Sequence, residues 1–298
     1  MLAELQSPRK REIAHPSGWR LRTPTDNEFR RLFAVVESAA GIALNDTKYA
    51  LVVRRLSSRI RELGLTSLGD YTDLVCADDS QSELVVLLNL IATNETHFFR
   101  EPQHFTFLEQ TMLPRWREDA DGGSRPRVVR AWSAACSTGQ EPYSLTMQLL
   151  THLPANDGWR HEILATDIST LALGVARTAE WSIERASEIP HDYLQRFMLR
   201  GVGERIGRMR ATRELRDAVR FERFNLNDEQ YDLAGTFDLI FCRNVLIYFS
   251  TSGRAAVINR LVDKLAPGGL LFVGHAESLH AHRDRLRAVL PTVYTPLA

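Results

Sequence analysis

The chain has 298 residues, of which 44% are hydrophobic and 25% charged, as expected for a folded globular protein of one large or two smaller domains. Its 37 basic and 37 acidic side chains cancel, which argues against a protein that binds bulk nucleic acid. Three separated cysteines without a CxxC pair argue against a zinc site or a disulfide framework. The same cysteine usage fits a reducing cytoplasm, where we expect the protein. No apolar run reaches the length of a membrane span, and the N-terminal residues show no hydrophobic signal core.

The first third of the chain is predicted to be helical. Residues 1–23 form a mobile polar lead, and residues 24–92 form a small all-helical domain with apolar residues at helical spacing. Capping residues and glycines set the expected helix ends. The four helices are expected to run from Thr25 or Asp26 to near Gly41, from Asn45 or Asp46 to Leu63, over 68–76 and over 83–92.

The second of these helices combines an apolar stripe with a cluster of basic side chains. The stripe consists of Tyr49, Val53, Leu56, Ile60 and Leu63, spaced as one helical face, and the basic residues beside it are Lys48, Arg54, Arg55, Arg59 and Arg61. One interpretation is a solvated face whose long side chains lie along the helix. The other is a docking surface for an acidic partner helix. Few acids on the same helix offset this charge, which favours docking.

Residues 93–105 are predicted to be a linker with an unusually polar start. Five hydrogen-bonding residues, TNETH, precede two phenylalanines and Arg100. A simple interpretation is a helix cap at Asn94 or Thr96. The density of polar groups favours contacts to a ligand, with Arg100 paired to a carboxylate.

The stretch RVVRAWSAACSTGQEPY, residues 127–143, reads as a buried strand, a loop of small residues and the start of a helix. A second apolar strand follows and ends in Asp167, where folds of this kind bind ribose hydroxyls. The loop has one glycine rather than the three of the dinucleotide fingerprint. A more compact ribose-bearing cofactor, such as S-adenosylmethionine, therefore fits better.

Strands and helices alternate from residue 127 onward, which predicts a doubly wound, mostly parallel sheet in an α/β domain. The arginine-rich, glycine-containing stretch over residues 193–220 interrupts this pattern. We expect it to form a short antiparallel insertion, either a solvated loop or a second surface for a negatively charged partner.

Four motifs together resemble the chemotaxis receptor methyltransferases, the CheR family. They are TNETHFFREPQHF, WSAACSTGQEPYS, FDLIFCRNVLIYF and GGLLFVGHAESL, and the similarity covers about residues 25–296 in order. The resemblance implies a helical N-terminal domain (24–92), a linker (93–105) and a Rossmann-like methyltransferase domain (106–298) with a small β-subdomain at residues 193–220.

The resemblance also implies a set of site residues. Arg100 would lie near the methionine carboxylate, Asp167 would hold the ribose hydroxyls, and Asn225 and Leu226 would flank the adenine. Tyr248, Arg243 and Arg100 would be the catalytic residues, with Tyr248 close to the transferred methyl. The complete set of implied cofactor contacts is Asn94, Thr96, Arg100, Glu141, Asp167, Asn225, Leu226, Arg243 and Asn244.

The implied reaction transfers a methyl group from S-adenosylmethionine to receptor glutamates and leaves S-adenosylhomocysteine. A glutamate with a pKa of about 4.3 is ionised at neutral pH, so we expect in-line displacement with no general base and no metal. The implied partners are helical cytoplasmic domains of chemoreceptors, with recruitment to membrane receptor arrays. The resemblance leaves open a receptor C-terminal peptide at the β-subdomain, and we expect a monomer without nucleic-acid partners or membrane insertion.

Other classes of function fit less well. A nucleic-acid base methyltransferase would usually carry a D/N-P-P-Y-type tetrapeptide where this chain has CRNV. A small-molecule methyltransferase would not need a basic helical domain. A non-catalytic module that binds S-adenosylmethionine and docks on signalling partners remains the alternative of a different class.

Overall fold

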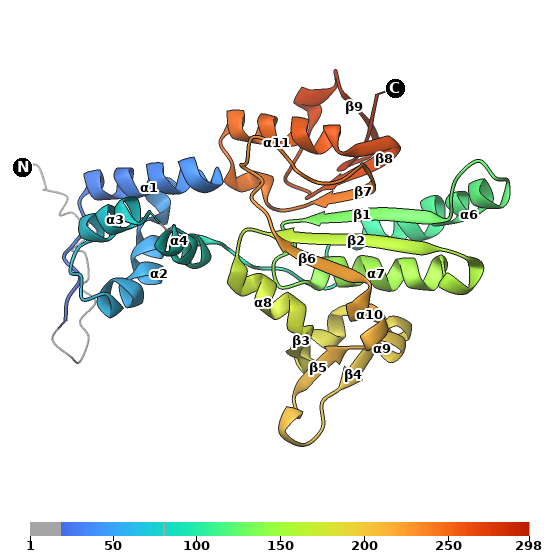
Figure 1. The fold of residues 1–298 in the computed structure, drawn as a ribbon, viewed down its shortest axis with the longest axis horizontal. Coiled ribbons are helices and arrows are strands. Elements are labelled where there is room, and N and C mark those ends of the chain that lie inside the picture. Colours follow the sequence, from blue (N-terminus) through green and yellow to red (C-terminus); the bar gives the residue numbers. More distant parts are fainter. Residues whose placement is uncertain (1–18, 80, 298) are drawn as a thin grey trace, which may run out of the picture. The chain divides into compact units, whose positions relative to one another are not determined.

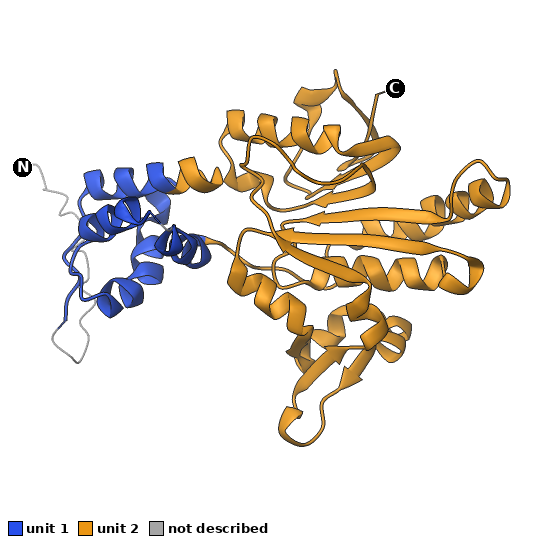
Figure 2. Cartoon of the chain, viewed as in Figure 1, with its two compact units in different colours: residues 1–35, 44–91 blue, residues 36–43, 92–298 orange. Residues whose placement is uncertain are grey.

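The computed structural model describes residues 19–79 and 81–297. Most of the predicted polar lead, residues 1–18, lies outside the described residues. The chain divides into two compact units (Figure 2). One contains the described residues up to Val35 together with Leu44–Ile91, and the other contains Val36–Ala43 and the chain from Ala92 onward.

The first unit is all-helical, as predicted. Its elements are α1 (Asp26–Ala40, whose last turn is grouped with the second unit), the 3₁₀ turn η1 (Asp46–Lys48), α2 (Tyr49–Glu62), α3 (Leu68–Ala77) and α4 (Ser82–Ile91). In α2, Leu56 and Ile60 are buried as expected, but Val52 is the third core residue instead of Val53. The α-helix itself begins at Tyr49, after η1. Its three buried residues follow one another at a spacing of four, whereas the predicted stripe alternated spacings of four and three.

A seven-stranded sheet forms the centre of the second unit (Figure 1). Its strands, in spatial order, are β6 (Val219–Arg223), β2 (Arg160–Asp167), β1 (Val128–Ala134), β7 (Phe237–Cys242), β8 (Leu265–Val273), β10 (Val293–Pro296) and β9 (Leu286–Leu290). The first five are parallel and β10 is antiparallel to both of its neighbours. The mostly parallel sheet confirms the predicted fold class, while β9 was not predicted.

The register of the sheet separates two hydrophobic cores. Ala131 pairs with Leu239 and faces one core, whereas Trp132 pairs with Ile240 and faces the other. The first core includes residues of α5 (Pro102–Phe107), the π turn η2 (Leu108–Met112), α6 (Leu113–Asp121), α7 (Gln140–His152) and α8 (Thr170–Thr178). The second core includes α11 (Thr251–Asp263). Burial on both faces explains the apolar runs within the central strands, such as Leu239–Cys242 of β7.

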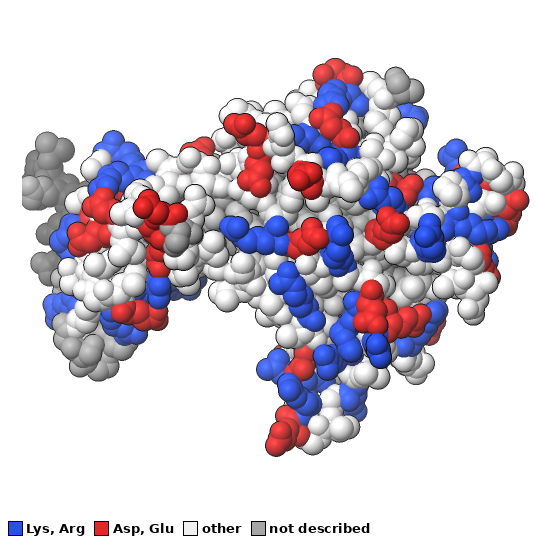
Figure 3. Space-filling view, in the orientation of Figure 1, with Lys and Arg blue, Asp and Glu red and all other residues white. Residues whose placement is uncertain are grey.

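The predicted insertion is a small antiparallel sheet of order β3-β5-β4, built from β3 (Glu180–Ser182), β5 (Arg208–Ala211) and β4 (Met198–Arg200). It is accompanied by the 3₁₀ turns η4 (Ile183–Glu188) and η5 (Gly203–Arg205) and by α9 (His191–Phe197) and α10 (Arg213–Asp217). Figure 3 shows basic side chains gathered over it; Arg200, Arg205, Arg208 and Arg210 are exposed. The small sheet begins earlier than the predicted range 193–220, because β3 lies at Glu180–Ser182 and a three-residue strand is too short to show a period.

None of the helices in the described ranges has the length and apolar character needed to cross a membrane.

Candidate functional site

The carboxyl ends of β2, β1, β7 and β8 lie side by side at one edge of the parallel sheet. Ligands of open α/β sheets bind at this edge, in the crevice outside the strand ends. The structure brings Asp167, Arg243 and Asn244 there from the ends of β2 and β7. The sequence pattern placed Asp167 at a strand end, and the family resemblance implied Arg243 and Asn244. The 3₁₀ turn η6 (Leu246–Tyr248) follows Asn244.

The loop after β1 is tightly wound. Ala135, Ser137 and Gly139 all have positive φ values, of 70°, 51° and 96°. A side chain at Gly139 would also come within 3.0 Å of the Ala176 Cβ, so this position needs glycine for both reasons. The N–H groups of Cys136, Ser137 and Gly139 are used within the fold, by the Thr166 carbonyl, the Asp167 carboxylate and the Cys136 carbonyl.

Asp167 is fixed by this loop. Its Oδ2 accepts a hydrogen bond from the Ser137 N–H and its Oδ1 accepts one from the Ser169 N–H, each at 2.8 Å. Burial raises the pKa of the Asp167 carboxyl, although the hydrogen bonds from backbone N–H groups act in the opposite direction. The carboxylate is thus held in one orientation, and each oxygen keeps a further lone pair for a hydroxyl donor.

The segment 94–101 is hydrogen-bonded along this edge of the sheet. The Asn94 carbonyl accepts from Ser137 Oγ at 2.9 Å, the Phe99 N–H donates to Ser144 Oγ at 2.9 Å, and the Arg100 carbonyl accepts from Arg243 Nη1 at 2.5 Å. The segment therefore brings Asn94, Thr96 and Arg100 close to the strand ends. The helix-cap interpretation was wrong, because α4 ends at Ile91 and Glu101 precedes α5.

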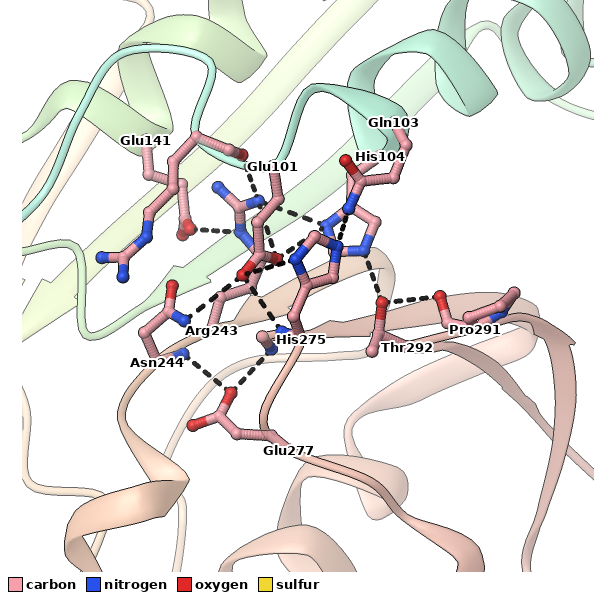
Figure 4. A network of polar contacts seen from close by, with 12 residues as sticks. Glu101, Gln103, His104, Glu141, Arg243, Asn244, His275, Glu277, Pro291 and Thr292 are labelled. Carbon is pink, nitrogen blue, oxygen red and sulfur yellow. Dashed lines mark hydrogen bonds and ion pairs between the residues drawn. The ribbon is translucent and has the colours of Figure 1, made fainter.

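Arg243 is a buried member of an ionic network rather than an exposed group (Figure 4). Its Nε donates to Glu141 Oε2 at 2.8 Å, and its Nη1 lies 3.6 Å from Glu101 Oε2. Glu141 also accepts from Ser133 Oγ at 2.6 Å. Among the residues that the structure describes, no hydrogen-bond partner meets the buried Nη2 of Arg243 or Oε2 of Glu101. A buried donor without a partner at a ligand-binding edge indicates a place for a polar ligand group.

His104, which the sequence analysis did not single out, is held neutral beside Arg243. Its Nδ1 lies 3.2 Å from Arg243 Nη1 and its Nε2 lies 2.8 Å from Thr292 Oγ1. Because Arg243 can only donate, Nδ1 accepts and Nε2 carries the proton, and the Thr292 hydroxyl donates onward to the Pro291 carbonyl at 2.6 Å. Burial and the Arg243 charge lower the pKa of His104 to about 4. Both ring nitrogens are engaged, so His104 is not placed as a base.

Glu101 and Glu277 connect the loops around the site and were also missed. Glu101 has a φ of 57°, and its Oε1 accepts from Asn244 Nδ2 at 3.3 Å and from the His275 N–H at 3.0 Å. Glu277 is fully buried and accepts from the N–H groups of Gly274, at 2.6 Å, and Asn244, at 2.7 Å. Burial raises the pKa of Glu277. Glu277 follows the apolar strand β8, just as Asp167 ends the apolar strand β2. The reasoning that identified Asp167 could therefore have identified Glu277 as a site residue.

The remaining predicted residues lie in the loops after β6 and β7. The Asn225 side-chain amide donates to the Ala39 carbonyl at 2.8 Å, and Leu226 is buried with its carbonyl accepting from Tyr231 Oη at 2.7 Å. Tyr248 is half-buried, and its carbonyl accepts from the Ala43 N–H at 2.7 Å. Contacts of Asn225 and Leu226 with adenine, and of Tyr248 with the methyl group, stay predictions.

The basic residues of α2 belong to the first unit and differ in environment. Arg59 forms a two-pronged ion pair with Glu83 of α4, at 3.0 and 2.6 Å, and Arg55 donates to the Ile91 carbonyl. Lys48 and Arg54 are exposed, whereas Arg61 is half-buried. The acid that α2 lacks is thus supplied by another helix, which counting charges on one helix cannot reveal. The docking surface stays a prediction, centred on the exposed members.

No group of three or more His, Cys, Asp or Glu side chains suited to a metal ion occurs within 19–79 and 81–297. Cys136 is buried, and burial raises the pKa of its thiol. A buried, protonated thiol is a poor nucleophile.

Two family models match the chain. The model described as "CheR methyltransferase, all-alpha domain" matches residues 27–92, and "CheR methyltransferase, SAM binding domain" matches residues 94–295. The chain is 38% identical over 270 residues to the chemotaxis protein methyltransferase of Escherichia coli K12, covering 91% of each chain. It is 37% identical over 272 residues to chemotaxis protein methyltransferase 2 of Pseudomonas aeruginosa, covering 91% of this chain and 94% of the relative.

Proposed function

The chain belongs to the CheR methyltransferase family, and on this basis we propose that it methylates glutamate carboxylates in the cytoplasmic domains of chemoreceptors. The methyl donor would be S-adenosylmethionine and the products a glutamate methyl ester and S-adenosylhomocysteine. The observation that carries the proposal is the convergence of the segment 94–101, the Asp167 carboxylate and the buried Arg243 at one edge of the sheet.

The residues at this edge fit S-adenosylmethionine. Asp167 presents oriented carboxylate oxygens, which suit ribose hydroxyls. The unpartnered Nη2 of Arg243 and the half-buried guanidinium of Arg100 supply donors for the carboxylate of the methionine part. When bound, the cofactor supplies a methyl carbon activated by a positively charged sulfur.

The protein's part in the reaction would be alignment and exclusion of water. A substrate glutamate is already ionised at neutral pH, so no residue has to remove a proton from it. His104 is engaged at both nitrogens and stays neutral, in agreement with a reaction that needs no base. Tyr248, on η6 beside the strand end, is proposed to hydrogen-bond the incoming carboxylate and hold it in line with the methyl carbon.

Arg243 is proposed to act on the cofactor and on the segment 94–101 rather than on the substrate. Its side chain is 1% exposed and is already bonded to Glu141 and to the Arg100 carbonyl. A guanidinium held this way cannot swing out to meet a receptor carboxylate without breaking a buried ion pair. This refines the role that the sequence suggested for Arg243.

The helical unit is proposed to dock on the receptor helices. Lys48 and Arg54 are exposed on α2 and complement a glutamate-rich surface. The proposed setting is the cytoplasmic face of a receptor array, with the chain acting as a monomer.

The proposal is tested by incubating the protein with radiolabelled S-adenosylmethionine and membranes that carry chemoreceptors. We expect label on the receptor band that mild base releases, as a methyl ester requires. Asp167→Ala should abolish it, while Asp192→Ala, at an exposed site on α9, should not. Calorimetric binding of the cofactor without label on any receptor would instead support a non-catalytic binding module.

A further inference from the structure

The segment Glu180–Glu188 has two roles in the fold. Its first part, β3, pairs with β5 in the small sheet, with Trp181 opposite Met209. Its second part, η4, contacts the segment 94–101 beside the proposed cofactor site. The small sheet is therefore joined to the site by direct hydrogen bonds and not only through the chain.

Glu188 is the main link between η4 and the segment 94–101. Its Oε2 accepts from the Phe98 N–H at 2.9 Å, and its Oε1 accepts from Arg185 Nη1 at 2.7 Å and lies 3.2 Å from His97 Nδ1. Arg185 Nη1 in turn lies 3.4 Å from the Thr96 carbonyl. Burial opposes ionisation, but hydrogen bonds from Arg185, the Phe98 N–H and His97 lower the pKa of Glu188. Glu188 thus acts as a carboxylate that fixes the backbone at Thr96–Phe98.

Trp181 makes the second link, to the loop after β1. Its indole Nε1 donates to the Thr138 carbonyl at 3.0 Å. The buried ring meets Phe98 and Tyr143 edge-on, with centroid distances of 5.0 and 5.3 Å. One side chain therefore touches both the loop that holds Asp167 and the segment that carries Thr96 and Arg100.

We propose that Glu188 and Trp181 are positioning residues for cofactor binding, which hold the segment 94–101 and the loop 135–139 in the geometry that the cofactor requires. This rests on the proposed function of the same site. Neither side chain has to touch the cofactor. Because binding couplings are reciprocal, cofactor binding should also make the β3–η4 segment more rigid.

The proposal is tested with Glu188→Ala and a matched control, Glu184→Ala, which removes an exposed glutamate from the same 3₁₀ turn. Binding of S-adenosylmethionine and S-adenosylhomocysteine is measured by calorimetry, and amide hydrogen exchange is followed over residues 93–101 with and without cofactor. We expect Glu188→Ala to weaken binding of both by about tenfold and to deprotect the Phe98 amide, since several hydrogen bonds to a charged group are lost. At saturating cofactor, kcat should stay within about twofold, because the chemistry itself is unchanged.

Equal affinity of Glu188→Ala and Glu184→Ala would overturn the proposal, as would a fall in kcat at saturating cofactor with no change in affinity. Should Glu188→Ala not fold, Trp181→Phe supplies the second test. It keeps an aromatic ring against Phe98 but removes the donor to Thr138, and it should weaken cofactor binding without changing kcat. A wild-type protein that binds no S-adenosylmethionine would refute the proposed function itself, so the two failures are distinguishable.

Discussion

Arg243 and Glu141 form an ion pair at 2.8 Å in which the side chains are 1% and 9% exposed. They lie 102 residues apart, at the end of β7 and in the first turn of α7. The pair joins the two elements that flank the candidate cofactor site, and through the Arg100 carbonyl it also holds the segment 94–101. A single guanidinium therefore connects three parts of the site.

This burial makes Arg243 sensitive to substitution. Arg243→Met leaves Glu141 buried with only the Ser133 hydroxyl, so we expect the free energy of unfolding to fall by about 3–5 kcal/mol, measured in guanidinium chloride. Arg243→Lys should be nearly as costly, because an ammonium cannot reproduce bonds from both Nε and Nη1. The double variant Arg243→Met/Glu141→Gln should lose less than the two single losses combined. Additive losses would show that the pair is not energetically coupled.

Tyr248 tests the proposed alignment of the substrate carboxylate. Tyr248→Phe removes only a hydroxyl, so we expect kcat for receptor methylation to fall by about tenfold, or roughly 1.4 kcal/mol, with cofactor affinity within about twofold. The comparison variant is Tyr231→Phe, whose buried hydroxyl donates to the Leu226 carbonyl. That change should lower stability by about 1 kcal/mol and leave kcat intact. An unchanged kcat in Tyr248→Phe would remove Tyr248 from the proposed mechanism.

Three of the expected site residues lie at the sheet edge, and each is marked in the sequence by its position at the end of an apolar strand. Asp167 ends an apolar strand, and Arg243 and Asn244 follow the most apolar one, so strand-end placement alone brings them together. The mostly parallel sheet, without β9, followed from the alternation of apolar strands and helices. The placement of Asp167 and the fold class needed only hydrophobic pattern and chain order, whereas the choice of Arg243 and Asn244 as site residues came from the family resemblance.

What the sequence did not predict depends on distant contacts. Glu101 is recognised by its positive φ and by its hydrogen bond to Asn244, 143 positions away. His104 is held by its contacts with Arg243 and Thr292, which both lie more than a hundred residues after it in the sequence. Glu83 neutralises Arg59 from a neighbouring helix, and β3 is too short to show a period. None of these features can be recognised from a short window of the sequence.

His104 gives a prediction for the pH dependence of stability. Its pKa is about 4 when folded and near 6.5 when unfolded, so the unfolded state binds more protons between these values. This contribution to stability is complete above pH 6.5 and is lost as the pH falls toward 4, amounting to about 3 kcal/mol. Denaturant titrations of the wild type and His104→Gln from pH 4 to pH 7.5 isolate it as a difference.

The difference is needed because other groups titrate in the same range. Asp167 and Glu277 have raised pKa values and favour the folded state at low pH, while His161, whose pKa is lowered by burial, acts in the same direction as His104. All three remain in both proteins and cancel in the comparison. Parallel curves for the two proteins would contradict the neutral, Nε2-protonated His104 bonded to Arg243 and Thr292.

Two arginines of α2 are expected to differ in their roles, Arg54 in receptor docking and Arg59 in stability. Arg54 is exposed, so Arg54→Glu should raise the KM for receptor several-fold, most strongly at low salt, without a change in melting temperature.

Arg59 pairs with Glu83, which also accepts from Tyr71 Oη at 2.9 Å. Arg59→Glu therefore places two carboxylates together and should lower stability by about 2 kcal/mol. The two variants are compared at matched folded fractions. If both raise the KM for receptor equally, docking does not depend on whether the arginine of α2 is exposed. A KM unaffected by Arg54→Glu at any salt concentration would move the docking surface away from α2.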